Sequence, residues 1–269
     1  MQPNRIIIRV RGGLGNQLFI YAFARYISLN LNSSVLLETR TGFIRDRYRR
    51  KYLLNKFNIQ LKACSWIFSL YYPLRHRFAA ITKLIYGNAI YMDEIEYNTD
   101  RELALLKIMK SKKTYMDGYW QDSTYFGDYE DIIKKDLSLK INVKSQNQKM
   151  ANDMIHCNCV AIHLRRVKYN TILELDYYLK AVNQIKAQIE DPVFYVFSDD
   201  IKWCRQNFIN DGSFIFVDNN CNNELLDIWL MSQCKHFIIA NSTFSWWGAW
   251  LSKNPEKIII KPGMKNIKE

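Results

Sequence analysis

Two adjacent arginines follow a short apolar run in His163-Leu164-Arg165-Arg166. Guanidinium groups at the end of a buried strand are costly unless an anion neutralises them, and their forked donors match phosphate oxygens. The pattern has two explanations: an anion site, or a pair of structural salt bridges. The first explanation makes this segment a candidate site for a phosphate-containing ligand.

Two adjacent acids end the next strand-like run, in Phe197-Ser198-Asp199-Asp200. Because they open a predicted helix, N-capping explains them as well as ligand binding does. A carboxylate here could also accept the two N–H groups on one edge of a guanine ring. Asp-x-Asp spacing is absent, and no His and carboxylate cluster has metal-ligand spacing, so we expect no metal cofactor.

A glycine-rich turn, Gly12-Gly13-Leu14-Gly15-Asn16-Gln17, follows the first apolar run of the chain. Glycines let a ligand approach the backbone and leave N–H groups at the start of the next helix, which favours anions. The spacing is not G-x-G-x-x-G, and a tight turn alone would need one or two of these glycines. Without other motifs, the pattern has weak specificity.

Polar residues precede an aromatic helix in Asn241–Trp250, with the sequence NSTFSWWGAW. Asn, Ser and Thr before a helix are caps by default, but they also place hydroxyl and N–H groups where a phosphate could bind. Three tryptophans within five residues are too bulky for an ordinary surface helix.

Strands and helices alternate in a way that places all four motifs at strand ends. The first half begins as strand, glycine-rich turn, helix and strand, at 6–10, 12–17, 18–30 and 34–38. Residues 39–112 are predicted to be helical with long connections, 114–120 a strand, and 122–137 a helix with an acidic first turn. The second half has strands at 160–164, 193–197, 214–217, 237–240 and 257–260, and helices near 175–190, 200–208, 223–234 and 244–252.

This alternation predicts an α/β fold with parallel sheets covered on both faces, in two Rossmann-like units that face each other. The polar stretch Ser145–Asn152 is the predicted boundary. It separates an N-terminal domain, 1–145, from a C-terminal domain, 146–269. Ligands of such sheets bind at the carboxyl ends of the strands, where the motifs lie.

The composition is that of a globular protein of 269 residues, 48% hydrophobic and 24% charged, with 17 Tyr, 14 Phe and 7 Trp. Six cysteines stand at 64, 157, 159, 204, 221 and 234, and the only close pair is C-x-C, so we expect reduced thiols in a cytoplasmic protein. The chain opens without a signal-peptide pattern. The most apolar stretch, Trp66–Ile90, is interrupted by basic residues, which favours an amphipathic segment or a helical pair over a membrane span.

The net charge of +12 calls for an acidic partner or a solvated basic face. Basic residues are densest in the first half, at Arg40, Arg45, Arg47, Arg49, Arg50, Lys51, Lys56, Arg75, Arg77 and Lys83. A contact with the anionic inner face of the cytoplasmic membrane is one explanation. Nucleic acid is not an expected partner, because the chain has no zinc-finger spacing, RNP motif or other nucleic-acid module.

Four segments, GGLGNQLFIYAFA, HLRR, FSDD and ANSTFSWWGAWL, resemble in order and distance those of the bacterial α-1,2-fucosyltransferases of glycosyltransferase family 11. The α-1,6- and protein O-fucosyltransferases resemble the chain more distantly. The similarity spans roughly residues 5–262, and Asp117–Gln121 with Tyr125-Phe126 also looks like a family segment. The resemblance implies a GT-B fold of two Rossmann-like domains, with the active site between them and no metal. The N-terminal domain, 1–145, is then expected on the acceptor side, and the C-terminal domain, 146–269, is expected to bind the GDP-sugar.

The resemblance also implies roles for individual residues. Catalytic roles fall to Arg165 and Arg166, on the pyrophosphate, and to Asn16, near the reacting sugar. Donor binding falls to Gly12, Gly13, Gly15, His163, Asp199, Asp200, Asn241, Ser242, Thr243 and Phe244, with His163 and the aspartates near guanine. The acceptor is expected near Tyr119, Trp120 and Gln121, and Glu174 and Asp176 are candidate acids.

One departure from the family pattern follows the arginine pair, where Val167-Lys168-Tyr169 replaces Gly-Asp-Tyr. A lysine therefore stands where the family has a carboxylate. Either that acid is dispensable, or Glu174 or Asp176 takes its place, or activity has drifted.

The predicted function is inverting transfer of L-fucose from GDP-β-L-fucose to the 2-OH of a terminal β-galactoside, in a galactose-terminated oligosaccharide or lipid-linked glycan such as an O-antigen precursor. Two alternatives remain. The first is a transferase for another GDP-sugar, because phosphate and guanine contacts do not recognise the sugar. The second is a non-catalytic GDP-sugar or glycan binder, which the lysine substitution leaves open.

Overall fold

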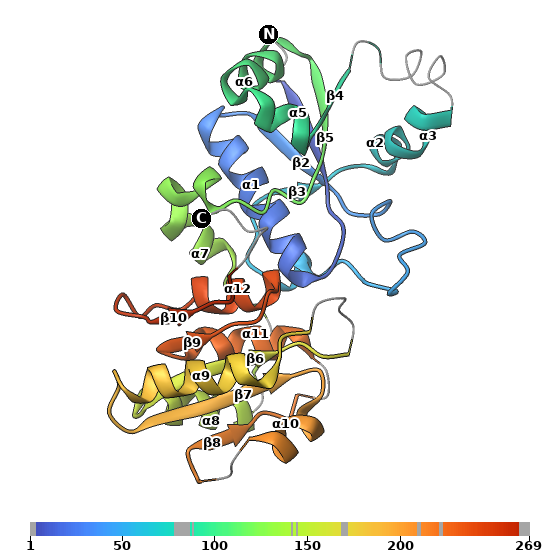
Figure 1. Cartoon of the computed structure of the whole chain (residues 1–269). Helices are drawn as coiled ribbons and strands as arrows, with labels where there is room; N and C mark the ends of the chain where they lie inside the picture. The colour runs from blue at the N-terminus through green and yellow to red at the C-terminus, as the bar shows by residue number, and fades with distance from the viewer. Residues whose placement is uncertain are drawn as a thin grey trace. The chain divides into compact units, whose positions relative to one another are not determined.

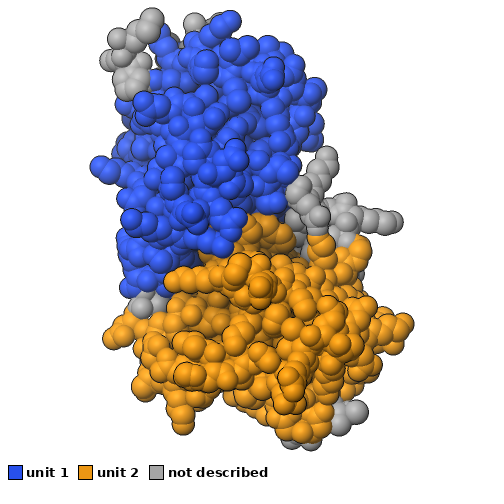
Figure 2. Space-filling view, turned by 90° about the vertical axis from the view of Figure 1, so that its left-hand side faces the viewer, with its two compact units in different colours: residues 1–140, 267–269 blue, residues 141–266 orange. Residues whose placement is uncertain are grey.

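The computed structural model describes residues 4–77, 87, 89–140, 142–143, 145–167, 172–208, 211–220 and 223–263. These residues form two compact units, one within 1–140 and one within 141–266, coloured blue and orange in Figure 2. Each unit is built around its own five-stranded sheet, in which all neighbouring strands run parallel. The fold class is therefore α/β, as the sequence predicts.

The sheet of the first unit has the order β3-β2-β1-β5-β4. Its strands are β1 (Arg5–Arg9), β2 (Ser34–Glu38), β3 (Lys62–Ala63), β4 (Ile90–Asp93) and β5 (Lys113–Asp117). The chain runs outward from β1 to β3 and then continues on the other side of β1. The strand order thus changes direction between β1 and β5, and such a switch point is where open α/β sheets bind ligands.

Helices cover the first sheet (Figure 1). They are α1 (Leu14–Asn30), α2 (Trp66–Ser69), α3 (Tyr71–Arg77), α5 (Glu94–Thr99), α6 (Arg101–Lys110) and α7 (Glu130–Asp136), with short 3-10 turns η1 (Leu54–Lys56), η2 (Ser123–Tyr125) and η3 (Gly127–Tyr129). Ile7 and Tyr115 are register partners, and Tyr71 and Tyr72 of α3 pack on them. Helix α1 contacts β1 and β2, and its buried Phe23 stacks on Trp120.

The sheet of the second unit has the order β10-β9-β6-β7-β8. Its strands are β6 (Asn158–Leu164), β7 (Pro192–Ser198), β8 (Phe214–Phe216), β9 (His236–Ile238) and β10 (Ile259–Ile260), and its helices are α8 (Ser145–Ile155), α9 (Leu175–Lys186), α10 (Ile201–Asn207), α11 (Glu224–Gln233) and α12 (Thr243–Trp250). Alternate residues of β6 pack with α9 and α10 in one core. The strand order changes direction between β6 and β9.

Every strand and helix expected in the second half is confirmed within a few residues, and the strand expected at 34–38 is confirmed as β2. Helix α1 starts at Leu14, earlier than the expected residue 18, because the turn ends at Gly13. The single helix expected over 122–137 is wrong: Asp122 caps the short turn η2, and α7 begins only at Glu130. The sequence also missed β3 and β4, which have only two and four residues.

The polar stretch expected at the domain boundary forms the start of α8, which buries one side chain per turn at Asn147, Ala151 and Met154. The division between the two compact units falls between Lys140 and Ile141. Within the described ranges, no helix has the length and apolar character that a bilayer crossing requires. The described cysteines are free thiols, and Cys221 lies outside the described residues.

Candidate functional site

The polar motifs of the second unit gather at the carboxyl edge of its sheet. Arg165 and Arg166 follow β6, Asp199 and Asp200 follow β7, and Ser242 follows β9. Strand β6 pairs with both β7 and β9, so the three loops are neighbours at the point where strand order reverses.

The two arginines meet the two aspartates. Arg165 Nε lies 3.9 Å from Asp199 Oδ2, and Arg166 Nε lies 3.6 Å from Asp200 Oδ2. Both separations exceed hydrogen-bond length. All four side chains keep between 23% and 34% of their surface exposed. Partly exposed ion pairs without a hydrogen bond contribute little stability by themselves, so these two contacts leave room for an anion as an alternative partner.

Each aspartate side chain also accepts a hydrogen bond from a backbone N–H group. Asp199 Oδ1 accepts a 2.7 Å hydrogen bond from the Arg166 N–H, which ties the loop after β6 to the loop after β7. Asp200 caps α10 by accepting from the Trp203 N–H at 3.2 Å. The capping explanation is therefore confirmed for Asp200, although capping occupies only one of its oxygens. The Arg166 guanidinium also stacks 3.5 Å over the Trp203 ring, which fixes its plane.

His163 is buried on β6 and faces α12. Its Nδ1 shares a hydrogen bond with the Ser245 hydroxyl, and its ring lies 5.2 Å from that of Phe244. Burial, with the charge of Arg165 as a smaller cause, lowers the pKa of His163 to about 3. The imidazole is therefore neutral at physiological pH and offers a hydrogen-bonding edge.

Helix α12 begins at the same edge without a side-chain cap. Ser242 is the N-cap residue, and its hydroxyl makes no capping hydrogen bond. Ser242 and Phe244 are buried, whereas Asn241 and Thr243 are half-buried. Backbone N–H groups at such a helix start are suited to oxygens of a phosphate. This edge thus combines two guanidinium groups, a neutral imidazole and a helix N-terminus.

The glycine-rich turn of the first unit lies at the switch point between β1 and β5. Gly12 has φ +81°, and a Cβ there would approach the Asn16 side chain to 2.8 Å and Tyr119 to 3.2 Å. Gly13 is the N-cap residue of α1, and Gly15 and Asn16 lie in its first turn. Gly12 is therefore required by its φ and by the close contact with residues 16 and 119.

The residues expected to bind the acceptor divide into two groups. Gln121 Nε2 donates to Asn16 Oδ1 at 3.0 Å, so this pair joins the glycine-rich turn to the loop after β5. Tyr119 is half-buried beside Gly12. The expectation for Trp120 is corrected: its side chain is fully buried and stacks on Phe23 at 3.9 Å, so it belongs to the core.

The two candidate acids after the arginine pair are both exposed. Glu174 is the N-cap residue of α9, and Asp176 pairs with Lys180 on the helix surface at 2.7 Å. Neither is described in contact with the arginines. Val167 is exposed, and Lys168 and Tyr169 lie outside the described residues.

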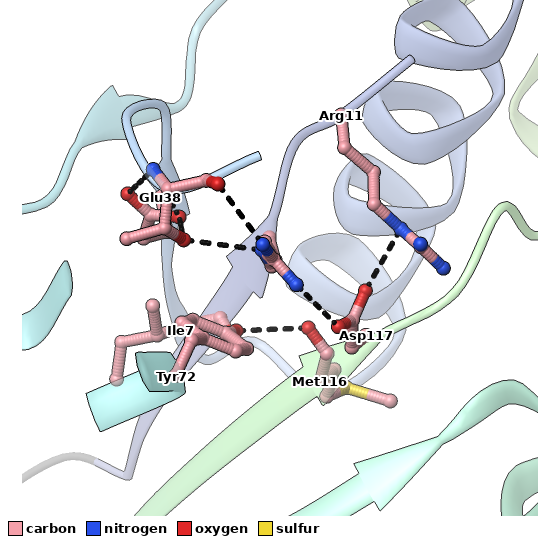
Figure 3. Close-up of polar contacts among 8 residues, drawn as sticks. Ile7, Arg11, Glu38, Tyr72, Met116 and Asp117 are labelled. Atoms are coloured by element: carbon pink, nitrogen blue, oxygen red, sulfur yellow. Dashed lines mark hydrogen bonds and ion pairs between the residues drawn. The ribbon is translucent and has the colours of Figure 1, made fainter. Parts of the chain in front are cut away.

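Charged residues that the sequence analysis did not assign surround Asp117 at the end of β5 (Figure 3). Asp117 lies 3.0 Å from Arg9 Nη1 through one oxygen and 3.0 Å from Arg11 Nε through the other. Arg9 also donates to the Thr41 hydroxyl and carbonyl, and the fully buried Glu38 holds Thr41. For Arg165, the sequence analysis reasoned that an arginine at the end of a buried strand needs an anionic partner. The same reasoning would have singled out Arg9 and Arg11, because they also end a buried strand.

Two further residues position the motifs. The fully buried Gln17 joins the glycine-rich turn to the loop before η1, because its amide donates to Gly12 O and Lys51 O and accepts from the Leu53 N–H. Ser245 orients His163. Within the described ranges, no three His, Cys, Asp or Glu side chains gather in a way that could hold a metal.

The folds of known fucosyltransferases are similar to this structure. The fucosyltransferase NodZ from Bradyrhizobium aligns with a TM-score of 0.61 over 94% of each chain at 14% identity. POFUT1 in complex with GDP-fucose aligns with a TM-score of 0.53 over 97% of this chain and 99% of that chain at 11% identity. These matches confirm an α/β fold with two parallel sheets.

Sequence comparison extends over nearly the same length. The O-antigen biosynthesis glycosyltransferase WbnK of Escherichia coli is 32% identical over 93% of this chain and 91% of its own. The alpha-1,2-colitosyltransferase of Escherichia coli is 30% identical over 96% of this chain and 91% of its own. The profile of glycosyl transferase family 11 matches residues 5–267. With its motifs at the carboxyl edges of two parallel sheets, the chain belongs to glycosyl transferase family 11.

Proposed function

We propose that this family 11 glycosyltransferase is an inverting fucosyltransferase with a GT-B fold. It transfers L-fucose from GDP-β-L-fucose to the 2-OH of a terminal β-galactoside. The observation that carries the proposal is the meeting of Arg165, Arg166 and His163 with the uncapped start of α12 at one sheet edge. The similarity to the O-antigen glycosyltransferase supports a glycan acceptor.

Cations and N–H groups supply the chemistry that departure of GDP requires. The bond between fucose C1 and the β-phosphate oxygen breaks as the acceptor oxygen bonds to C1 from the opposite face. Negative charge then develops on the diphosphate, and Arg165, Arg166 and the N–H groups after Ser242 stabilise it. Asp199 and Asp200 release the guanidinium groups and face the base edge of guanine. The acceptor hydroxyl loses its proton to a general base.

Metal independence is part of the proposal. Two guanidinium groups can neutralise a diphosphate without a divalent ion, and Asp200 already serves as a helix cap. The deciding experiment is GDP release from GDP-fucose with a panel of β-galactosides, in magnesium and in excess EDTA. We expect equal rates in both and an α-1,2-linked product by NMR. Complete loss of activity in EDTA that manganese restores would exclude this mechanism.

A different donor sugar is the second candidate, favoured by the similarity to the alpha-1,2-colitosyltransferase. Contacts to guanine and diphosphate do not by themselves select the sugar, so a GDP-colitose donor is compatible with the same residues. Running the assay with the GDP derivatives of fucose and colitose separates the two. Nucleotide binding without transfer from any donor would indicate a non-catalytic GDP-sugar or glycan binder.

We also propose that the first unit makes peripheral contact with an anionic lipid surface. Residues 1–140 contain 23 Lys and Arg against 13 Asp and Glu, and so carry +10 of the net +12. Trp66 and Ile67 of α2 are 62% and 44% exposed. Aromatic and basic residues together are typical of proteins that rest at a membrane interface.

A further inference from the structure

Arg11 is held in place at the switch point of the first sheet and keeps N–H donors for a ligand. It stands between β1 and the glycine-rich turn, and its guanidinium stacks 4.3 Å over the Tyr119 ring. Its Nε lies 3.0 Å from Asp117 Oδ1. The terminal nitrogens, which lie beyond this contact in Figure 3, make no hydrogen bond to the described residues. With a third of its side chain exposed, Arg11 can offer both of them to a ligand.

Asp117 fixes the direction in which Arg11 points. Its second oxygen is bonded to Arg9 at 3.0 Å, and only 13% of its side chain is exposed. Arg9 is in turn bonded to Thr41, which the buried Glu38 holds. Because both Asp117 oxygens are engaged, the carboxylate cannot rotate without losing a charged partner. A fixed guanidinium loses less conformational entropy on binding a ligand than a mobile one does.

The groups beside Arg11 are those that recognise sugar hydroxyls. Asn16 and Gln121 are joined by one hydrogen bond at 3.0 Å, and amide side chains can both donate hydrogen bonds to hydroxyl groups and accept from them. Tyr119 adds an aromatic ring, and apolar faces of sugars pack on such rings. Asp117 offsets one of the two positive charges of Arg9 and Arg11, and its carboxylate would repel an anion placed close to it. Neutral hydroxyl oxygens are therefore suitable partners for the terminal nitrogens of Arg11.

We propose that Arg11 binds hydroxyl oxygens of the acceptor glycan and that Asp117 is its positioning residue. This inference rests on the proposed transferase function and adds a residue that contacts the acceptor. Arg11→Lys keeps the charge but removes the planar fork, and Asp117→Asn keeps the shape but weakens the ion pair. Arg5→Lys is the matched control, because Arg5 begins the same strand and stacks over Phe68 at 5.1 Å.

The test measures KM and kcat for the β-galactoside that the wild-type enzyme uses best, KM for GDP-fucose, and slow GDP release without acceptor. We expect Arg11→Lys to raise the acceptor KM at least tenfold, with donor KM and acceptor-free GDP release within twofold of wild type. Asp117→Asn should raise the acceptor KM severalfold. The double variant should be no worse than Arg11→Lys, because Asp117 acts through Arg11.

The outcomes separate this inference from the proposed function. An acceptor KM unchanged in Arg11→Lys overturns the role of Arg11, and a rise confined to the donor KM overturns the acceptor as its ligand. Additive effects in the double variant overturn the positioning role of Asp117. A wild-type enzyme that transfers no sugar from GDP-fucose overturns the proposed donor instead, whatever the variants do.

Discussion

Arg165 and Arg166 are each paired with an aspartate at a distance too long for a hydrogen bond. A structural salt bridge would gain from closer, bidentate contact, whereas a phosphate site needs guanidinium groups that can change partner. The stacking of Arg166 on Trp203 keeps that side chain oriented when its ionic partner changes. The structure therefore shows the arginine–aspartate pairs, and the phosphate site stays a prediction.

Removal of either arginine should reduce turnover while the fold persists. We expect Arg165→Ala and Arg166→Ala each to cost about 2 to 4 kcal/mol of transition-state stabilisation, measured as kcat/KM with GDP-fucose. Arg205→Ala is the matched control in the same unit, because Arg205 also pairs with an aspartate, Asp218, and stacks over Phe216. Near-normal kcat/KM with a lowered melting temperature in both variants would show that the arginines are structural.

His163 should make the second unit less stable in acid. Its folded pKa of about 3 lies below the value of about 6.5 in an unfolded chain, so the unfolded state binds the extra proton as pH falls. Stability attributable to His163 is complete above pH 6.5 and declines from there toward pH 3, by about 2 kcal/mol at pH 5.

Urea unfolding at pH 7 and pH 5 measures this loss. His163→Asn should show a smaller decrease in unfolding free energy between the two pH values than wild type. His156→Asn, at an exposed position, serves as the control. Equal decreases in wild type and His163→Asn would contradict the assignment of a buried neutral imidazole.

At the scale of elements, close contacts between loops hold the carboxyl ends of the strands in place. A Cβ on Gly42 would lie 2.0 Å from Val10 O and 2.7 Å from the Arg11 Cβ, so the loop after β2 lies directly on the end of β1. No rearrangement of a flexible side chain relieves a clash with backbone oxygen. The position of Arg11 thus depends on a glycine some thirty residues away.

Gly42→Ala should therefore destabilise the first unit by about 2 to 3 kcal/mol or more, through displacement of backbone. Thermal unfolding followed by circular dichroism checks this. Gly127→Ala is the control, because nothing lies within 4 Å of a Cβ built there. Similar melting temperatures for Gly42→Ala and wild type would show that the two loops can move apart without cost.

The sequence predicted the elements whose patterns are long and regular. Strands such as β6, with seven residues and six of them buried, are apparent from composition alone. β3 and β4 are two and four residues long, so they give almost no periodic signal, and tertiary pairing with β2 and β5 forms them. The sequence also predicted the positions of the arginine and serine motifs. Polar residues that cap a helix and cations at the end of a strand can be recognised from the neighbouring residues alone.

The sequence analysis did not predict contacts between residues far apart in the chain. The burial of Trp120 follows from Phe23 on α1, almost one hundred residues earlier in the chain. The bond between Asn16 and Gln121 spans 105 residues, and the ion pair of Arg11 with Asp117 depends on the adjacency of β1 and β5. These pairings arise from strand order, which residue spacing does not encode.

At the scale of the whole molecule, charge is divided unequally between the units. Residues 39–92 contain eleven Lys and Arg, and Asp46 is their only acid, so this segment alone accounts for the excess charge of the first unit. The second unit, in contrast, pairs Arg165 and Arg166 with aspartates. An excess of positive charge in one part of a protein attracts acidic partners by long-range electrostatics.

We therefore expect the protein to sediment with vesicles that contain phosphatidylglycerol but not with vesicles of phosphatidylcholine alone. Raising salt to about 0.5 M should release it, because ionic attraction at this strength is screened within a few ångströms. Trp66→Ala combined with Ile67→Ala should weaken sedimentation at low salt, since both side chains are exposed on α2. Ile95→Ala is the control, because Ile95 is 80% exposed but stands between Glu94 and Glu96. Equal sedimentation of the α2 variant and wild type would show that charge alone attracts the protein to lipid, and binding to neither vesicle would exclude the membrane contact.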